Sequence, residues 1–362
     1  MNVCIPKERR PFEYRVGLTP SSLKMLTKKG HQCYVEHDAG LGAGFSDQEY
    51  QQAGAIIAYS SHEVFGRADL LLKVARPLLE EIDWLQPGAT IAGLIHFGSA
   101  RKNKIDKLLQ KKITTIAYEQ IRLPDGTVPV RRPLSEIGGR LAAQIAARLL
   151  QNDAGGKGIL IGGVPAVPPA EIVIIGAGVV GTFATRAFLG MDAHVTVLDK
   201  NLRALQRISE RFSCVTMISN PGNIARACSY ADVIIGAILV PGEPPPVVVT
   251  RSILHDMKER SVVMDVSIDE GGCIETSRPT THEHPTFIEE GLIHYCVPNM
   301  PSIVARTATH AFLNAAFPFI FEIANKGVEK AISDNPSLKL GVGTYRGEIT
   351  NISTISPRQQ ME

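Results

Sequence analysis

The sequence lacks the features that would place a protein in a membrane, on nucleic acid or outside the cell. Its six cysteines form no C-x-x-C pair and are sparse in a chain of 362 residues, which indicates reduced thiols and a cytoplasmic protein. The net charge is only +2, so no bulk field draws the chain to nucleic acid or an anionic membrane. The apolar stretch at residues 172–191 is interrupted by four glycines, which argues against a membrane span, and the first residues show no signal-peptide pattern.

The sequence also shows little that would indicate a metal site or a nucleic-acid-binding surface. His282 and His284 form a His-x-His pair, but no further ligand set accompanies them, so we expect no metal site. Arg131 and Arg132 make too short a basic run to indicate nucleic-acid binding. We find no internal repeat and no low-complexity segment, so the chain reads as an ordinary globular protein that is long enough for two domains.

The most informative segment is a glycine fingerprint near the middle of the chain. Residues 171–175 form a short apolar run typical of a buried parallel strand, and the pattern G-x-G-x-x-G follows at once, before a helix-like segment at 179–189. Gly176 permits a tight turn, Gly178 lets the backbone approach a pyrophosphate, and Gly181 lets helix and strand pack closely. The pyrophosphate would lie on the helix N-terminus, where free N–H groups favour an anion.

An acidic residue at the expected distance selects the cofactor. Asp199 ends the next strand, 21 residues after Gly178, which suits a carboxylate that binds the ribose hydroxyls and repels a 2′-phosphate. We therefore predict NAD as cofactor, although Lys200 and Arg203 weaken the preference over NADP. The alternative is a structural glycine turn without a ligand. The contacts predicted from this segment are Gly176, Gly178, Val179, Val180, Gly181 and Asp199.

Strands alternate with helices on both sides of the fingerprint. Apolar runs predict strands at residues 3–5, 32–36, 56–58, 70–74, 90–96, 114–117, 171–175, 194–199, 214–218, 233–236 and 262–266. Long helices are expected at 133–151 and 307–332, the latter with a kink at Pro318, and residues 333–362 are polar and expected to be partly loose.

This pattern predicts an α/β fold with two doubly wound domains. A central Rossmann NAD-binding domain, residues 128–306, is inserted in a discontinuous substrate domain formed by residues 1–127 and 307–362. In such sheets ligands bind outside the carboxyl ends of the strands. Lys73 and His96 close strands of the first domain, and Asp269 follows a strand of the second, so we expect a cleft between the domains.

Hydride chemistry gives these residues possible roles. The unperturbed pKa of a histidine side chain lies near neutrality, so His96 suits proton transfer. Arg15 can bind a substrate carboxylate in bidentate fashion, and Lys73 can polarise a carbonyl or bind a carboxylate. Taken singly, each has a plain alternative: His96 as a satisfied structural group, Lys73 as a solvated strand end and Arg15 as a surface charge. The residues alone indicate an NAD-dependent enzyme that acts on a small anionic substrate.

The chain resembles bacterial L-alanine dehydrogenase over nearly its whole length, and more distantly the NAD-binding subunit of proton-pumping transhydrogenase. The matching segments are residues 15–20 (RVGLTP), 68–74 (ADLLLKV), 134–144 (LSEIGGRLAAQ), 162–165 (GGVP), 235–242 (IGAILVPG), 269–273 (DEGGC), 277–281 (SRPTT) and 299–301 (NMP). The resemblance implies reversible oxidative deamination of L-alanine to pyruvate and ammonium with NAD. It also implies a homohexamer in the cytoplasm.

The resemblance also assigns residues. Arg15 and Lys73 would bind the oxo acid, His96 would be the acid–base group, and Asp269 would assist near the nicotinamide. Leu134 would contact the substrate side chain. Further cofactor contacts would be Ser135, Ser219, Leu239, Asn299 and Met300.

The sequence departs from the family pattern around the presumed substrate pocket. Lys-Val-Ala-Arg-Pro at 73–77 replaces Lys-Val-Lys-Glu-Pro, Phe97 and two small residues replace Leu-Ala-Ala, and Arg131 stands where the family has an apolar residue. A different segment also follows the 299–301 match. We hypothesise that Arg131 faces the cleft and adapts it to a larger or anionic side chain; drift on the rim, favoured for Arg132, is the alternative. Another amino or imino acid dehydrogenase, and a non-catalytic NAD-binding homologue, are therefore the competing functions.

Overall fold

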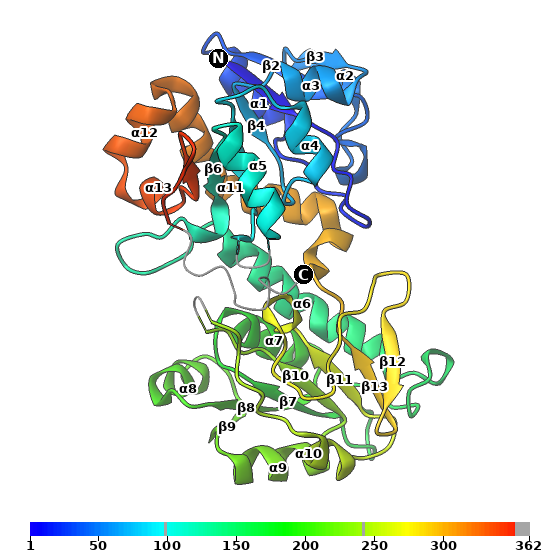
Figure 1. The fold of residues 1–362 in the computed structure, drawn as a ribbon. Coiled ribbons are helices and arrows are strands. Elements are labelled where there is room, and N and C mark those ends of the chain that lie inside the picture. Colours follow the sequence, from blue (N-terminus) through cyan, green and yellow to red (C-terminus); the bar gives the residue numbers. More distant parts are fainter. Residues whose placement is uncertain (98–99, 241–242, 352–362) are drawn as a thin grey trace. The chain divides into compact units, whose positions relative to one another are not determined.

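The computed structural model describes residues 1–97, 100–240 and 243–351 (Figure 1). The chain divides into two compact units. Unit 1 comprises Met1–Leu134 and the chain from Ser302 onward, and unit 2 comprises Ser135–Pro301. Residues 128–134 and 302–306 therefore belong to unit 1, whereas the domain prediction gave them to the nucleotide-binding domain. The functional roles assigned to the two domains stay predictions.

Unit 1 is built on a six-stranded sheet in which every strand pair is parallel, in the order β3-β2-β1-β4-β5-β6. Its strands are β1 (Asn2–Ile5), β2 (Gln32–Glu36), β3 (Ile56–Ala58), β4 (Leu70–Leu72), β5 (Thr90–Gly93) and β6 (Thr114–Ala117). These runs are rich in buried apolar side chains, as expected where helices cover both faces of a sheet. Strands β4 and β5 end earlier than predicted, so Lys73 and His96 lie just beyond them.

Helices connect these strands and complete the unit. They are α1 (Pro20–Thr27), α2 (Asp47–Gln52), α3 (Ser61–Gly66), α4 (Leu79–Trp84), α5 (Lys102–Gln110), α11 (Ala305–Lys326), α12 (Val328–Asp334) and α13 (Pro336–Leu340), with short 3-10 turns at η1 (Leu41–Ala43) and η3 (Tyr118–Gln120). The prediction of one long helix at 307–332 is wrong. Gly327 has a φ of +80°, which a helix cannot accommodate, so α11 ends there and α12 begins.

The C-terminal segment is more ordered than its polar composition suggested. A small hairpin of β14 (Thr344–Tyr345) and β15 (Glu348–Ile349) follows α13. The buried Thr344 hydroxyl lies 3.0 Å from that of Thr115 and 2.7 Å from the carbonyl oxygen of Ile113. The expectation of a loose tail is therefore wrong for the described residues 333–351, and it lies outside the described residues for 352–362.

Unit 2 contains a seven-stranded sheet in the order β12-β13-β11-β10-β7-β8-β9. Its strands are β7 (Glu171–Ile175), β8 (His194–Asp199), β9 (Val215–Ile218), β10 (Val233–Gly236), β11 (Val262–Asp265), β12 (Thr286–Glu289) and β13 (Leu292–Tyr295). Strand β12 alone is antiparallel, paired with β13 in a hairpin that the sequence reading missed. The helices are α6 (Arg131–Leu149), which starts in unit 1, α7 (Val179–Leu189), α8 (Leu202–Ser209), α9 (Pro221–Tyr230) and α10 (Arg251–His255); 3-10 turns lie at η4 (Asn152–Ala154), η5 (Ile268–Glu270) and η6 (Met300–Val304), the last reaching into unit 1.

Both sheets share one strand order. Counted within each unit, six strands follow the order 3-2-1-4-5-6, with β12 as an extra edge strand in unit 2. The order reverses between β1 and β4 in unit 1 and between β7 and β10 in unit 2. At such a switch point the connections leave on opposite faces and open a crevice at the carboxyl ends of the strands. The predicted α/β fold with two doubly wound sheets is confirmed, and each sheet offers one such place for a ligand.

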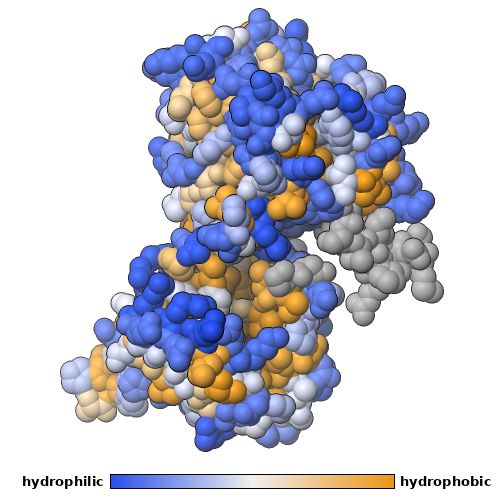
Figure 2. Space-filling model, turned by 90° about the vertical axis from the view of Figure 1, so that its left-hand side faces the viewer, coloured by the Kyte–Doolittle hydropathy of each residue, from blue (hydrophilic) through white to orange (hydrophobic). Residues whose placement is uncertain are grey.

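The surface of the molecule is mixed rather than uniformly apolar. On the face shown in Figure 2, hydrophilic residues cover much of the surface and hydrophobic residues form separate patches between them. Among the described helices, none combines the length and the apolar character that crossing a bilayer would require.

Candidate functional site

The glycine turn of unit 2 lies at its switch point, between β7 and α7. Gly176 has a φ of +115°, and a Cβ placed on it would lie 2.3 Å from the carbonyl oxygen of Ala237, which follows β10. A Cβ on Gly181 would lie 1.8 Å from the carbonyl oxygen of Gly176. Both positions therefore require glycine for the fold itself, as the predicted tight turn and close helix–strand packing demand.

Gly178 differs from these two glycines. It precedes α7 with a φ of −73°, and a Cβ added there would meet no described atom within 4 Å. Within the described residues no side chain caps α7, so the first N–H groups of this 11-residue helix are available to an anion. This open backbone surface next to free donors fits a pyrophosphate, which is the group that a dinucleotide would present.

Asp199 is tied to the same turn. One carboxylate oxygen accepts the N–H of Ala177 at 2.6 Å, and the other accepts the N–H of Asn201 at 2.7 Å. The carboxylate is half-buried at the end of β8. Asp199 thus supports the glycine turn, a role that the sequence reading did not foresee, and its role as a ribose ligand stays a prediction.

Most of the remaining predicted residues of unit 2 follow other strands at the same edge of the sheet. Ser219 follows β9 and donates its N–H to the carbonyl oxygen of Asp199 at 3.0 Å, and Leu239, 51% exposed, follows β10. Asp269 lies exposed in η5, after β11, and accepts the N–H of Asn299 at 3.1 and 3.3 Å. Of the others, Met300 is buried and Ser135 is half-buried on α6.

In unit 1, close backbone contacts bring the Arg15 loop onto the end of β4. A Cβ on Gly17 would lie 2.1 Å from the carbonyl oxygen of Leu72, so only glycine allows this approach. Arg15 is 2% exposed, and its guanidinium donates to both carboxylate oxygens of Glu13, at 2.7 and 2.5 Å. The alternative of a surface charge is therefore wrong, because Arg15 is a buried, bidentately paired cation at the switch point.

Lys73 follows β4 and is held between two carboxylates. Its ammonium lies 3.0 Å from Glu8 and 3.1 Å from Glu81, and all three side chains are at most 2% exposed. The solvated strand end weighed for Lys73 is thus wrong. Burial alone would lower the pKa of Lys73, but Glu8 and Glu81 outweigh it and raise the pKa, so the ammonium stays charged. Burial raises the pKa of Glu8, against the opposing effect of Lys73.

His96 follows β5 in a turn that a glutamate fixes. Its φ is +50°, a left-handed conformation that is uncommon outside glycine, and its side chain is exposed. The carboxylate of Glu119, in η3 after β6, accepts the N–H of His96 at 2.6 Å and that of Ile95 at 3.2 Å. A non-glycine residue held in this conformation at a strand end is a pattern that clusters at functional sites.

The residues that depart from the family pattern differ in their burial and in their contacts. Phe97 is 1% exposed in the core of unit 1, where its ring would meet a Cβ on Gly343 at 1.9 Å, so this departure is one of core packing. Arg76 is half-buried and its carbonyl accepts from Arg10 at 3.0 Å. Arg131 begins α6, half-buried, and Leu134 is buried one turn later. The substrate roles of Arg131 and Leu134 stay predictions.

Sequence reasoning missed the glutamates that support the predicted cations and the histidine. Glu13, Glu8, Glu81 and Glu119 each also accept a main-chain N–H near the residue that they hold. Glu13 lies two residues before Arg15, but Glu8 and Glu119 come from other segments than the residues that they hold, so no spacing rule singles them out. The only local signal is the pair Glu80 and Glu81 at the start of α4, which a helix N-terminus explains equally well.

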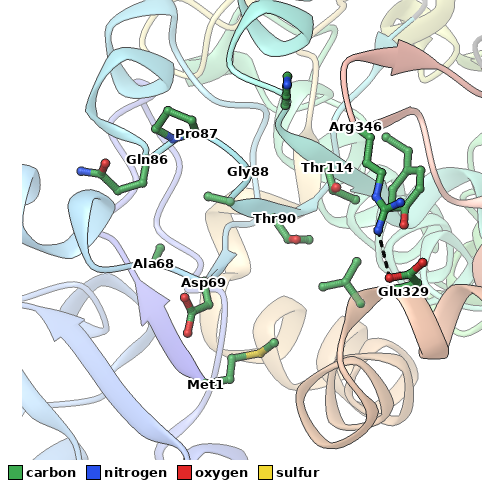
Figure 3. A pocket seen from close by; sticks show the side chains of 14 residues that line it. Met1, Ala68, Asp69, Gln86, Pro87, Gly88, Thr90, Thr114, Glu329 and Arg346 are labelled. Atoms are coloured by element: carbon green, nitrogen blue, oxygen red, sulfur yellow. Dashed lines mark hydrogen bonds and ion pairs between the residues drawn. The ribbon is translucent and has the colours of Figure 1, made fainter.

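Two other features of unit 1 lie away from these residues. A cavity of about 480 Å³ is lined by residues at the starts of β4, β5 and β6, including Asp69 and Thr90, and by the Glu329–Arg346 ion pair (Figure 3). It lies at the amino edge of the sheet, opposite Lys73 and His96. His37, Asp38 and Asp47 are the one group among the described residues with metal-ligand spacing, but His37 already bonds Asp47 on the surface.

A glycine cradle at one switch point and paired cations with a histidine at the other define a two-unit α/β dehydrogenase. Family models agree: alanine dehydrogenase/PNT, N-terminal domain, matches residues 4–138, and alanine dehydrogenase/PNT, C-terminal domain, matches residues 142–352. The chain belongs to the alanine dehydrogenase/PNT family.

Individual relatives cover almost the whole chain. An alanine dehydrogenase of Halomonas elongata is 44% identical over 97% of this chain and 95% of its own length, and one of Methanococcus maripaludis is 43% identical over 97% and 94%. A solved L-alanine dehydrogenase superposes with a TM-score of 0.93 at 39% identity, covering 99% of this chain and 98% of its own. A transhydrogenase of Sinorhizobium meliloti reaches 0.81 at 26% identity, covering 97% and 99%.

Proposed function

We propose that this chain catalyses the NAD-dependent, reversible oxidative deamination of L-alanine to pyruvate and ammonium. The relatives named alanine dehydrogenase support the reaction. The observation that carries it in this chain is the set Arg15, Lys73 and His96, which unit 1 gathers at the carboxyl edge of its sheet. The competing function of a non-catalytic NAD-binding homologue is not favoured, because every position expected to do chemistry holds a competent side chain.

The roles of these residues follow from their chemistry. The buried guanidinium of Arg15 and the ammonium of Lys73 bind the substrate carboxylate and carbonyl, which fixes the α-carbon. His96, exposed at its strand end, moves the proton as amine, carbinolamine and imine interconvert. Asp269 assists near the nicotinamide, held by the N–H of Asn299. NAD, when bound, supplies the hydride acceptor.

Unit 2 holds the cofactor in this proposal. Gly176, Gly178, Val179, Val180 and Gly181 form the pyrophosphate cradle. Asp199 binds the ribose hydroxyls. The further contacts carried over from the family are Ser135, Ser219, Leu239, Asn299 and Met300. Support comes from the open backbone at Gly178 and from the placement of most of these residues at one edge of the sheet.

The test of this function is a substrate comparison in the direction of amination. With NADH and ammonium, we expect pyruvate to exceed oxaloacetate and 2-oxoglutarate by more than tenfold in kcat/KM. This result would also dismiss the hypothesis that Arg131 adapts the pocket to a larger or anionic side chain. A faster reaction with another oxo acid would instead point to a different amino acid, and NADH binding without turnover of any oxo acid would point to the non-catalytic homologue.

Gly178→Ala should separate cofactor binding from folding. The added methyl group meets no described atom, so we expect thermal unfolding of the ligand-free protein to change little, while it obstructs the pyrophosphate and weakens NADH binding at least tenfold. NADH fluorescence titration and a melting curve measure the two effects. Gly181→Ala is the matched control, because its methyl group would lie 1.8 Å from a carbonyl oxygen and should damage the fold. Unchanged NADH affinity in Gly178→Ala would contradict the cradle.

The assembly and cellular location complete the proposal. The family resemblance supports a homohexamer, with the long helix α11 as one element able to pack between subunits, and a cytoplasmic location. Light scattering coupled to size-exclusion chromatography tests the hexamer, for which the mass expected is six times that of the 39.2 kDa chain.

A further inference from the structure

We propose that Glu81 is a positioning residue for the substrate: it aims the Lys73 ammonium and thereby sets the affinity for the oxo acid. This inference rests on the proposed function, in which Lys73 binds the substrate, and extends it to Glu81 on helix α4, which lies outside the segments that carried the resemblance in the sequence.

Glu81 links Lys73 to the chain that follows it. One carboxylate oxygen lies 3.1 Å from the Lys73 ammonium, and the other accepts the N–H of Leu78 at 2.7 Å. Glu81 occupies the third position of α4, so it also closes the start of that helix. Its side chain is 1% exposed, so neither bond exchanges freely with water. The ammonium is thus fixed relative to both α4 and the loop after β4.

Glu8 supplies the second constraint from a different segment. One of its oxygens lies 3.0 Å from the ammonium, while the other accepts the N–H of Val74 at 2.6 Å. An ammonium has three N–H donors. Glu81 accepts a hydrogen bond from one of them and Glu8 holds the ammonium in an ion pair, so two carboxylates anchored to the main chain restrict how the ammonium turns toward a substrate oxygen.

The other described neighbours of Lys73 offer its ammonium no competing carboxylate, so Glu8 and Glu81 determine how it is held. The ring of Phe65, on α3, lies with its centroid 5.9 Å from the ammonium and offers no acceptor atom. Arg9 lies 3.9 Å from the Glu81 carboxylate, and Arg10 and Lys104 also interact electrostatically with Glu81. Glu13 adds negative charge near Glu8. The charged groups that face this cluster are therefore Arg9, Arg10, Lys104 and Glu13. Loss of Glu81 leaves the ammonium with one anchored partner and freedom to turn.

The experiment compares Glu81→Gln with Glu80→Gln in the full-length enzyme. Gln keeps the size of Glu81 and an oxygen for the Leu78 N–H, but removes the charge that holds Lys73. With saturating NADH and ammonium we expect the KM for pyruvate to rise about tenfold or more in Glu81→Gln, with kcat lowered less than threefold and NADH affinity unchanged. Glu80 is exposed on the same helix, so Glu80→Gln should leave the KM for pyruvate, kcat and NADH affinity at their wild-type values.

A pH profile separates positioning from mere support of the fold. Glu81 is one of the two groups that raise the pKa of Lys73. Its removal lowers that pKa, so the alkaline limb of kcat/KM for pyruvate should move to lower pH in Glu81→Gln and stay in place in Glu80→Gln. A residue that only stabilises α4 would lower the melting temperature without moving this limb.

The outcomes distinguish this inference from the proposed function. A wild-type enzyme that aminates pyruvate, together with a Glu81→Gln variant whose KM stays within twofold of wild type, would overturn the role of Glu81 alone. A wild-type enzyme inactive with pyruvate would overturn the proposed function. If Glu81→Gln does not fold, Glu81→Asp decides: it keeps the charge but shortens the reach, and we expect a folded enzyme with a raised KM, whereas a wild-type KM would reject the inference.

Discussion

His96→Ala is expected to reduce turnover of pyruvate about 10²–10⁴-fold, the range that a positioned acid–base group contributes. NADH affinity should remain within twofold of wild type, because the glycine cradle is built from unit 2 alone and His96 belongs to unit 1. The fold should also persist, since the imidazole is exposed and Glu119 holds the turn through main-chain N–H groups that alanine retains. Stopped-flow turnover and NADH titration measure the two quantities.

A second histidine provides the control for this variant. His284 is exposed in unit 2, and His284→Ala should leave turnover within twofold of wild type. The role of His96 would be rejected if His96→Ala retained more than a tenth of wild-type kcat, or if its loss of activity were explained by lost NADH binding. Restoration of activity by added imidazole would strengthen the assignment.

Lys73→Met should be the most destabilising of these substitutions and should also abolish activity. It removes the ammonium that lies 3.0 Å from Glu8 and 3.1 Å from Glu81, two buried carboxylates, while keeping the apolar volume of the side chain. Loss of one partner from a buried ionic group costs about 3–5 kcal/mol. Denaturant unfolding measures the change in the free energy of unfolding, and Lys102→Met, which breaks an exposed pair with Asp106, should change it by less than about 1 kcal/mol.

The pH dependence of this loss identifies its cause. Burial already raises the pKa of Glu8 above its usual value, and Lys73 opposes that rise. Without Lys73 the folded-state pKa of Glu8 rises further above the unfolded value, so the folded variant binds protons more readily than the unfolded chain. Its stability should therefore be greatest in mild acid and fall as the pH rises through the raised pKa. A deficit independent of pH between 5 and 8 would indicate a packing defect instead.

The sequence was a good guide wherever a local pattern decides the structure. Apolar, β-branched runs placed the parallel strands within a few residues, and the glycine fingerprint placed the turn at Gly176. Prediction from the sequence failed where a single residue ends an element or where a partner distant in the sequence stabilises it. Gly327 ends a helix whose apolar pattern continues, and the hairpin of β12 and β13 is stabilised by partners that no local pattern reveals, such as the hydrogen bond between buried His294 and Thr276.

For the same reason, the sequence predicted the main residues of the candidate site but not the side chains that hold them. Arg15, Lys73 and His96 were named from strand ends and from resemblance, but their surroundings were not foreseen. Whether Glu80 or Glu81 faces Lys73 depends on how α4 packs, and the contact between Glu119 and His96 joins segments from two different strands. The chemistry of a side chain is readable from the sequence, whereas its degree of burial and its supporting partner emerge only from the fold.

The repeated strand order of the two sheets has a consequence for how this enzyme can change. At each switch point a glycine lies close against the main chain of its own unit: Gly17 against Leu72 in one, and Gly176 against Ala237 in the other. Substitutions that retune one crevice therefore leave the scaffold of the second untouched. In the proposed function, the two units bind the cofactor and the substrate separately, so we expect a variant selected for NADP at Asp199 to keep the oxo-acid selectivity of its parent.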